Sequence, residues 1–225
     1  MTGVGAIFDL DGVIVSTDKY HRQAWEALAR ELGIPFSEEQ ARATRGVDRM
    51  ASLRVVLGPR WDEFGEGERI ALASKKNELY VKLIGGITPK DALPGAVELV
   101  EALAAEGIPR AIGSASKNAL PVLERLGIAS LFSAIVTGFD FTRGKPAPDV
   151  FLVAAERIGS PPQQCVVFED AQAGIQAAHS GGMRAFGVGD PEIVAGCDRF
   201  SPSLAGVTVG DIIELAGMGK AQCGK

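Results

Sequence analysis

The sequence predicts an α/β fold in which a parallel sheet carries helices on both faces. Short apolar, β-rich runs alternate with amphipathic stretches, and glycine stands where several of these stretches are expected to end, as at Gly127 and Gly159. The last four strands follow one another at the spacing of β-α-β units, whereas roughly a hundred residues separate the first strand from the second. The expected strands are 4–8, 110–113, 134–136, 165–168 and 185–188.

Helical patterns fill the connections, including the long first one, which contains no convincing strand. The expected helices are 20–32, 38–44 and 66–84 in the first connection, and 95–106, 120–126, 149–158 and 173–180 beyond it. We therefore expect two domains. They are a Rossmann-like core of residues 1–15 and 93–225, and a small helical cap domain of residues 16–92 inserted after the first strand. Ligands of such open sheets bind at the carboxyl ends of the strands.

Composition narrows the function classes. The 225 residues, 46% of them apolar, are able to bury a sizeable core, and the net charge of −5 comes without any run of Lys or Arg, so no nucleic-acid partner is expected. Without a signal-peptide pattern or a long apolar segment, we expect a cytoplasmic protein with no membrane partner. Three cysteines without CxxC spacing argue against a disulfide framework or a zinc site, and Cys165, within an apolar run, is expected to be a buried thiol.

Asp9 and Asp11 lie two residues apart at the end of the first expected strand, directly before Gly12. Ionised carboxylates are seldom buried without a partner, and the repulsion between two of them raises the pKa of at least one. A site that uses one carboxylate as nucleophile and the other as acid/base, with a cation nearby, explains this arrangement. The alternative is an ordinary turn at Asp11 and Gly12.

Polar segments also follow the second and third expected strands. Residues 114–118 offer hydroxyls, an amide, an ammonium group and free N–H groups at a helix start, which suit a phosphate; an ordinary helix cap is the alternative. Lys145 precedes the helix after the third strand. There it would hold the nucleophilic carboxylate and a phosphoryl group together, unless it is simply solvated.

Glu169 and Asp170 end the fourth expected strand and form a second acidic pair. Four carboxylates at one edge of a sheet need a cation, and oxygen ligands together with phosphoryl chemistry favour Mg²⁺. A helix N-cap is the alternative role for this pair.

These four segments, in this order, resemble the motifs of the haloacid dehalogenase (HAD) superfamily of phosphotransferases. The resemblance covers nearly the whole chain, and the helical insertion resembles that superfamily's four-helix cap. Within the superfamily, the chain is most similar to the β-phosphoglucomutases. That similarity rests on residues 8–14, 20–25, 46–49, 75–77, 114–118, 145–149 and 169–175. The chain departs from the pattern at Ser16, Asp18 and Ala171, and these changes leave the chemistry intact.

The resemblance implies a nucleophile, an acid/base and a metal ion. Asp9 would attack the phosphoryl group and become an aspartyl phosphate, and Asp11 would serve as the general acid/base. The cofactor would be Mg²⁺, which neutralises charge on the phosphoryl oxygens. The implied metal ligands are Asp9, the backbone carbonyl of Asp11, Glu169 and Asp170.

The resemblance also implies supporting residues. Lys145 and Ser114 would complete the shell around the phosphoryl group, and His21 would link closure of the cap to the positioning of the acid/base. The implied substrate-binding residues are Thr17, Arg49, Lys76, Ala115, Ser116, Lys117 and Asn118. A histidine on a helix surface and a solvated helix lysine are the alternatives for His21 and Lys76.

The implied activity is the interconversion of β-D-glucose 1-phosphate and glucose 6-phosphate through glucose 1,6-bisphosphate. Arg49 would hold the phosphate that does not react, because its planar guanidinium suits a phosphate. A sugar-phosphate phosphatase with the same aspartyl-phosphate chemistry is the nearest alternative, and a non-catalytic module that binds a phosphorylated ligand is a more distant one. We expect a small-molecule sugar phosphate as the partner and a monomeric enzyme.

Overall fold

The computed structural model describes residues 3–44 and 49–217. The chain forms two compact units, one made of Met1–Ser16 and Thr88–Lys225 and the other of Thr17–Ile87. The expected domain boundaries, after residues 15 and 92, lie one and five residues from these divisions. Residues 46–48 of the predicted cap motif and Cys223 lie outside the described residues.

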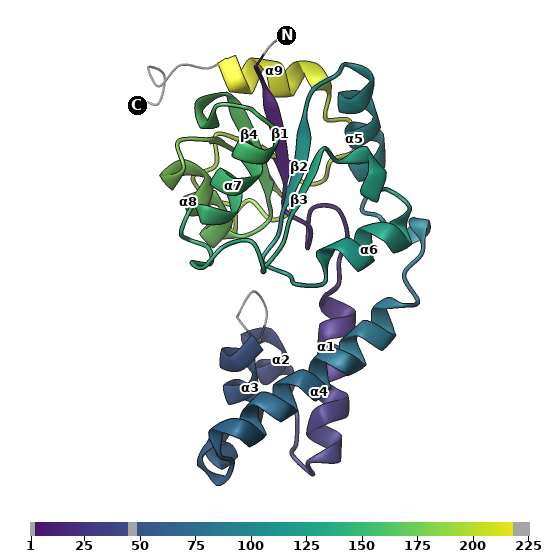
Figure 1. Ribbon diagram of the computed structural model, residues 1–225, viewed down its shortest axis with the longest axis vertical. Helices are drawn as coiled ribbons and strands as arrows, with labels where there is room; N and C mark the ends of the chain where they lie inside the picture. The colour runs from purple at the N-terminus through teal and green to yellow at the C-terminus, as the bar shows by residue number, and fades with distance from the viewer. Residues whose placement is uncertain (1–2, 45–48, 218–225) are drawn as a thin grey trace. The chain divides into compact units, whose positions relative to one another are not determined.

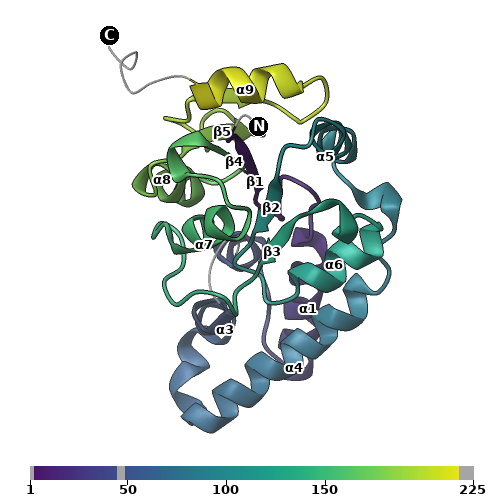
Figure 2. The ribbon, with the colours of Figure 1, turned by 45° about the horizontal axis from the view of Figure 1, so that its top comes forward.

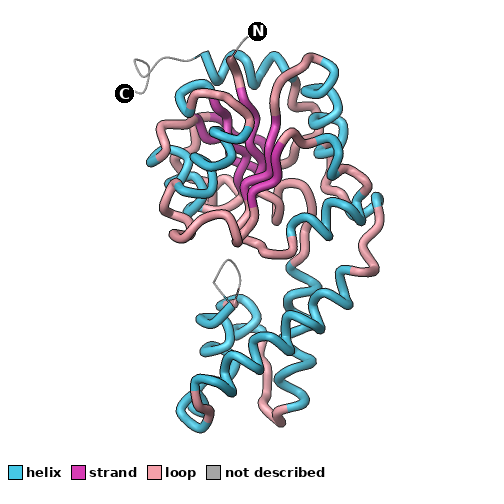
Figure 3. The backbone as a smooth tube through the Cα atoms, viewed as in Figure 1, coloured by secondary structure: helices cyan, strands magenta, loops and turns pink. Residues whose placement is uncertain are grey.

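The first of these units, the core unit, contains a six-stranded parallel sheet (Figures 1 and 3). Its strands are β1 (Gly5–Phe8), β2 (Arg110–Gly113), β3 (Ala134–Val136), β4 (Cys165–Glu169), β5 (Arg184–Val188) and β6 (Arg199–Ser201). They are arranged in the order β3-β2-β1-β4-β5-β6, with every neighbouring pair parallel. The predicted fold class and every expected strand are confirmed. The sequence does not predict β6, because Arg-Phe-Ser contains no apolar run.

Helices cover both faces of this sheet. They are α5 (Ala96–Ala105), α6 (Ala119–Leu126), α7 (Asp149–Arg157), α8 (Gln172–Ser180) and α9 (Val209–Gly217), with 3₁₀ turns at Pro89–Asp91, Ala129–Leu131 and Pro162–Gln164. α7 and α8 lie on one side of the strands, and α5 and α6 on the other (Figure 2). Ile7 and Val167 of the sheet pack with Phe151 of α7 in a fully buried cluster. Cys165 belongs to the same cluster, and burial raises the pKa of its thiol to about 12, as expected for an inert cysteine.

The strand order positions the candidate site. The chain leaves β1 toward β2 on one side, whereas β4 pairs with β1 on the other side. Phe8 pairs in register with Phe168, so Asp9 and Glu169, which follow them, occupy neighbouring positions at the carboxyl ends of β1 and β4. A crevice at such a switch in strand order is where open α/β sheets bind ligands.

The second unit, Thr17–Ile87, is called the helical unit here because its described residues form helices joined by loops. They are α1 (Asp18–Glu31), α2 (Glu38–Ala43), α3 (Arg49–Leu57), the 3₁₀ helix Gly58–Glu63 and α4 (Glu66–Ile84). α1 packs against α4, and Trp25, Leu28 and Leu53 lie in their shared core. α4 has the predicted bounds. The sequence does not predict α3, because polar Ser52 is one of its buried residues while apolar Met50 is only partly buried.

Within the described ranges, the helices are all too short or too polar to cross a membrane.

Candidate active site

Lys145 joins two of the predicted carboxylates at the carboxyl ends of β1 and β4. Its Nζ donates to Asp9 Oδ1 at 2.7 Å and to Glu169 Oε2 at 2.8 Å. The Lys145 side chain is 13% exposed, so the solvated-lysine alternative does not hold. Burial works to lower the pKa of Lys145, but the charges of Asp9 and Glu169 outweigh this effect and raise the pKa. The ammonium group therefore stays charged.

Asp9, Glu169 and Asp170 form a cluster in which one carboxylate oxygen from each residue lies within 4.8 Å of the other two. Burial raises the pKa of Asp170 to about 7, and the charges of Asp9 and Asp11 act in the same direction. Burial also raises the pKa of Glu169, with Asp9 adding to the effect and Lys145 opposing it. The single positive charge of Lys145 thus does not neutralise the three carboxylates of this cluster. Since carboxylate oxygens are the ligands that Mg²⁺ prefers, this donor set fits the predicted magnesium ion.

Two glycines leave room for the acidic side chains. A Cβ at Gly12 would lie 1.8 Å from Asp170 Oδ2, and a Cβ at Gly174 would lie 2.0 Å from Glu169 Cδ. Gly12 also has a φ of +76°, in the left-handed region that favours glycine. The turn after Asp11 therefore does more than reverse the chain, because it allows the β1 loop to approach Asp170 closely.

Residues 114–118 follow β2 and lead into α6. Ser114 is buried and its Oγ accepts from the Ser116 N–H at 3.1 Å, while Ser116 Oγ accepts from the Asn118 N–H at 3.2 Å. These hydroxyls therefore order the turn before α6, whereas the N-cap residue Asn118 makes no side-chain capping bond, so the helix-cap alternative does not account for this segment. The exposed members of the loop are Ala115 and Lys117.

Asp11 and Thr17 lie on the segment after β1. Asp11 is half-buried, and its charge contributes to the raised pKa of Asp170. Its carboxylate is not one of the three clustered carboxylates. The backbone carbonyl of Asp11 stays a predicted metal ligand. Thr17 is fully buried at the start of α1, where its carbonyl accepts from the His21 N–H at 3.1 Å.

The helical unit brings together His21, Arg49 and Lys76. Lys76 Nζ donates to His21 Nδ1 at 2.7 Å, and Arg49 donates to Asn77 Oδ1 at 2.8 Å. Burial lowers the pKa of His21 to about 3, and the charges of Lys76 and Arg49 add to the effect. Burial also lowers the pKa of Lys76 to about 7, with Arg49 adding to it. Lys76 is 4% exposed, so the solvated-lysine alternative does not hold here either.

Sequence reasoning does not identify the aromatic side chains beside these cations. Lys76 Nζ lies 4.6 and 5.2 Å from the ring centroids of Trp25 and Tyr80, and Lys145 Nζ lies 4.8 Å from that of Phe151. One signal was available, since Lys76 and Tyr80 are four residues apart in α4 and so share a face.

Comparisons with known proteins agree with this geometry. The model of the haloacid dehalogenase-like hydrolase family matches residues 5–182. The β-phosphoglucomutase of Bacillus subtilis is 41% identical over 194 residues, which are 85% of this chain and 86% of that protein. The fructose-1-phosphate phosphatase YqaB of Escherichia coli is 35% identical over 82% of this chain and 95% of that protein.

Among solved structures, a β-phosphoglucomutase from Clostridium difficile has a TM-score of 0.87 and 37% identity, with 94% of this chain and 96% of that chain covered. The fold, the order of the motifs and the family match lead to the same assignment. The chain belongs to the haloacid dehalogenase-like hydrolase family.

Proposed function

We propose that this chain is a Mg²⁺-dependent mutase that interconverts β-D-glucose 1-phosphate and glucose 6-phosphate. The reaction would pass through an aspartyl phosphate on Asp9 and through glucose 1,6-bisphosphate. The observation that carries the chemistry is the Asp9 carboxylate, which Lys145 holds at 2.7 Å beside Glu169 and Asp170. The 41% identity to a β-phosphoglucomutase supports the choice of substrate.

Asp9 would act as the nucleophile, since an ionised carboxylate needs no base before it attacks phosphorus. One Asp9 oxygen forms a bond to phosphorus while the bond from phosphorus to the sugar oxygen breaks. Asp11 gives a proton to that departing oxygen. In the other half-reaction, Asp11 takes a proton from the sugar hydroxyl that attacks the aspartyl phosphate. Lys145 supplies a positive charge to the phosphoryl oxygens throughout.

Asp9, Glu169, Asp170 and the backbone carbonyl of Asp11 would hold the magnesium ion. When bound, the ion offsets the negative charge of the carboxylates and of the phosphoryl group. Lys145 keeps the carboxylates of Asp9 and Glu169 in fixed positions, because it bonds to both.

A mutase also has to bind a phosphate that does not react. We assign Arg49 to this role, with contributions from residues 116–118, because a guanidinium binds phosphate through two parallel N–H bonds. Burial is the main cause of the lowered pKa of Lys76, charge repulsion from Arg49 adds to it, and a bound phosphate would relieve this repulsion. Lys76 and His21 would therefore bind the sugar phosphate or orient the side chains beside it.

A sugar-phosphate phosphatase is the second candidate, because a fructose-1-phosphate phosphatase is 35% identical to this chain. Its chemistry would use the same nucleophile and the same acid/base. Water, instead of a sugar hydroxyl, would then attack the aspartyl phosphate. In the chemical steps, the two functions differ in this acceptor.

Phosphorus NMR separates the two candidates. The chain is incubated with Mg²⁺, β-glucose 1-phosphate and a small amount of glucose 1,6-bisphosphate. Formation of glucose 6-phosphate supports the mutase, whereas steady release of inorganic phosphate selects the phosphatase. Asp9→Asn is the matched control and should abolish both reactions. If neither fluoroberyllate nor acetyl phosphate modifies Asp9 in Mg²⁺, the aspartyl-phosphate chemistry is wrong and a non-catalytic binding module is favoured.

A further inference from the structure

The turn of residues 137–140, directly after β3, is held closed by its own side chains. Asp140 Oδ2 accepts from the Thr137 N–H at 2.7 Å and from the Thr137 hydroxyl at 2.9 Å. Arg157 of α7 donates to Asp140 Oδ1 at 2.5 Å. This bond from Arg157 is the strongest of the effects that lower the pKa of Asp140. The carboxylate therefore stays charged, and the turn has a fixed shape.

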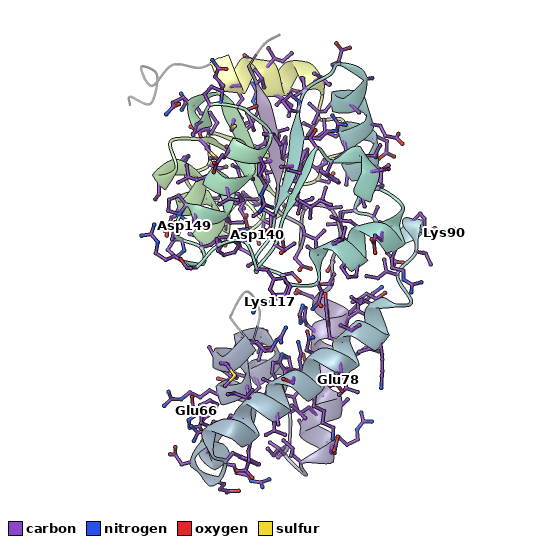
Figure 4. All side chains as sticks on the ribbon, in the orientation of Figure 1. Glu66, Glu78, Lys90, Lys117, Asp140 and Asp149 are labelled. Carbon is purple, nitrogen blue, oxygen red and sulfur yellow. The ribbon has the colours of Figure 1, made fainter. Side chains whose placement is uncertain are left out.

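The same turn contacts the loop that follows β2. The Gly138 N–H donates to the Ser116 carbonyl at 3.3 Å, and a Cβ at Gly138 would lie 2.4 Å from the Ala115 carbonyl oxygen. A side chain at position 138 would push the two segments apart, so glycine permits the contact. Figure 4 labels Lys117 and Asp140 on this end of the core unit.

Phe139 occupies the tip of this braced turn. Its side chain is 73% exposed, the largest value among the exposed large apolar residues of the described chain. Lys117 Nζ lies 5.0 Å from the Phe139 ring centroid, within the range of a cation–π interaction. Burial does not account for this ring. The ring does, however, contact the ammonium group of Lys117. Without that contact, the flexible Lys117 side chain samples many rotamers.

We propose that Phe139 is a positioning residue for Lys117, whose ammonium group it holds beside the loop of residues 114–118 to receive the non-reacting phosphate of the substrate. This inference rests on the proposed function, because that function assigns Lys117 to the phosphate. The ring acts before the ligand arrives. It limits the positions of the ammonium group, so that less conformational freedom is lost when the phosphate binds.

The test measures binding of glucose 1,6-bisphosphate to the full chain by isothermal titration calorimetry in Mg²⁺, with Asp9→Asn present throughout to prevent turnover. Phe139→Leu keeps an apolar side chain but removes the ring, and it should weaken binding about two- to fivefold. Phe139→Tyr and Phe139→Trp should restore the affinity, because both keep an aromatic face. Phe200→Leu is the matched control on β6, at the opposite edge of the sheet from β3, and should change nothing.

A second background shows whether Phe139 acts through Lys117. In the Lys117→Met chain, adding Phe139→Leu should cause no further loss of affinity, since no ammonium group is left to position. Equal affinities of the Phe139→Leu chain and its parent would overturn the inference, as would a full extra loss in the Lys117→Met background. Failure of the parent chain itself to bind the bisphosphate would instead overturn the proposed mutase and this inference together. Urea unfolding midpoints confirm that each variant is folded.

Discussion

Replacing Gly174 by alanine tests whether the close approach of α8 to Glu169 is what builds the acidic cluster. The added Cβ would lie 2.0 Å from Glu169 Cδ, 2.2 Å from Oε2 and 2.3 Å from Cγ, whereas ordinary contacts are 3.4–4 Å. The Glu169 side chain is 1% exposed, and its Oε2 accepts from Lys145 at 2.8 Å. It is therefore unable to move by the required distance of more than an ångström without breaking that bond.

Three effects decide the size of the change in stability. Overpacking a well-packed site costs about 1–3 kcal/mol, and loss of a hydrogen bond between charged groups costs about 1.5–3 kcal/mol. Alanine in place of a helical glycine stabilises the helix by about 1 kcal/mol, which offsets part of these costs. We therefore expect Gly174→Ala to lower the free energy of unfolding by about 1.5–5 kcal/mol, and the displaced Glu169 to weaken Mg²⁺ binding by about 10- to 100-fold.

Urea unfolding without metal and calorimetric titration with Mg²⁺ measure the two effects. Gly67→Ala is the matched control, because Gly67 also lies in a helix but a Cβ there meets no atom within 4 Å. That change should leave Mg²⁺ binding unaltered and stabilise the chain by up to about 1 kcal/mol. If Gly174→Ala is at least as stable as the parent chain and binds Mg²⁺ equally well, the steric reasoning is wrong.

Two further predictions concern the helical unit. Arg49→Ala should lower mutase turnover by about 10- to 100-fold, because one phosphate contact contributes about 1.5–3 kcal/mol. Formation of the aspartyl phosphate from acetyl phosphate should change far less. Arg22→Ala, which removes an exposed arginine, is its control, and equal losses in both reactions would contradict the second phosphate site. Folding lowers the pKa of Lys76 from 10.5 to about 7. Between pH 7 and 10.5, the unfolded chain therefore binds more protons than the folded chain, and the free energy of unfolding should rise with pH over this range. Urea unfolding across this range should show a smaller rise in Lys76→Met, and identical curves would exclude a buried amine.

Much of the core site was predictable from the sequence, because the carboxyl ends of parallel strands share one edge of a sheet. That rule brings Asp9, Lys145 and Glu169 together although up to 160 positions separate them in the chain. The structure then adds what no motif contains, the 2.7 and 2.8 Å bonds by which one lysine joins both carboxylates. The elements that were not predicted have weak patterns of their own. β6, for example, is a strand because three residues pair with β5.

The surroundings of single side chains were not predictable, because tertiary packing decides them. Lys75 and Lys76 are neighbours in α4, yet Lys75 is exposed and pairs with Glu31, whereas Lys76 is buried against Trp25. The only local signal that separates the two lysines is the spacing of four residues between Lys76 and Tyr80, which places them on one face of α4. Phe139 is the opposite case, an aromatic residue that is expected in a core but lies in solvent.

The basic cluster of the helical unit favours a phosphorylated ligand. A lysine that is 4% exposed beside a histidine and an arginine has lost hydration and experiences repulsion, and both effects destabilise the folded unit. A bound anion reverses both and stabilises the unit by mass action. Groups held in such surroundings are concentrated at functional sites. A phosphatase needs positive charge for the phosphate that it removes, which Lys145 already supplies in the core unit, whereas a mutase must also hold a phosphate that does not react. We therefore propose that Arg49 and Lys76 hold the phosphate that does not react, a role that supports the mutase over the phosphatase.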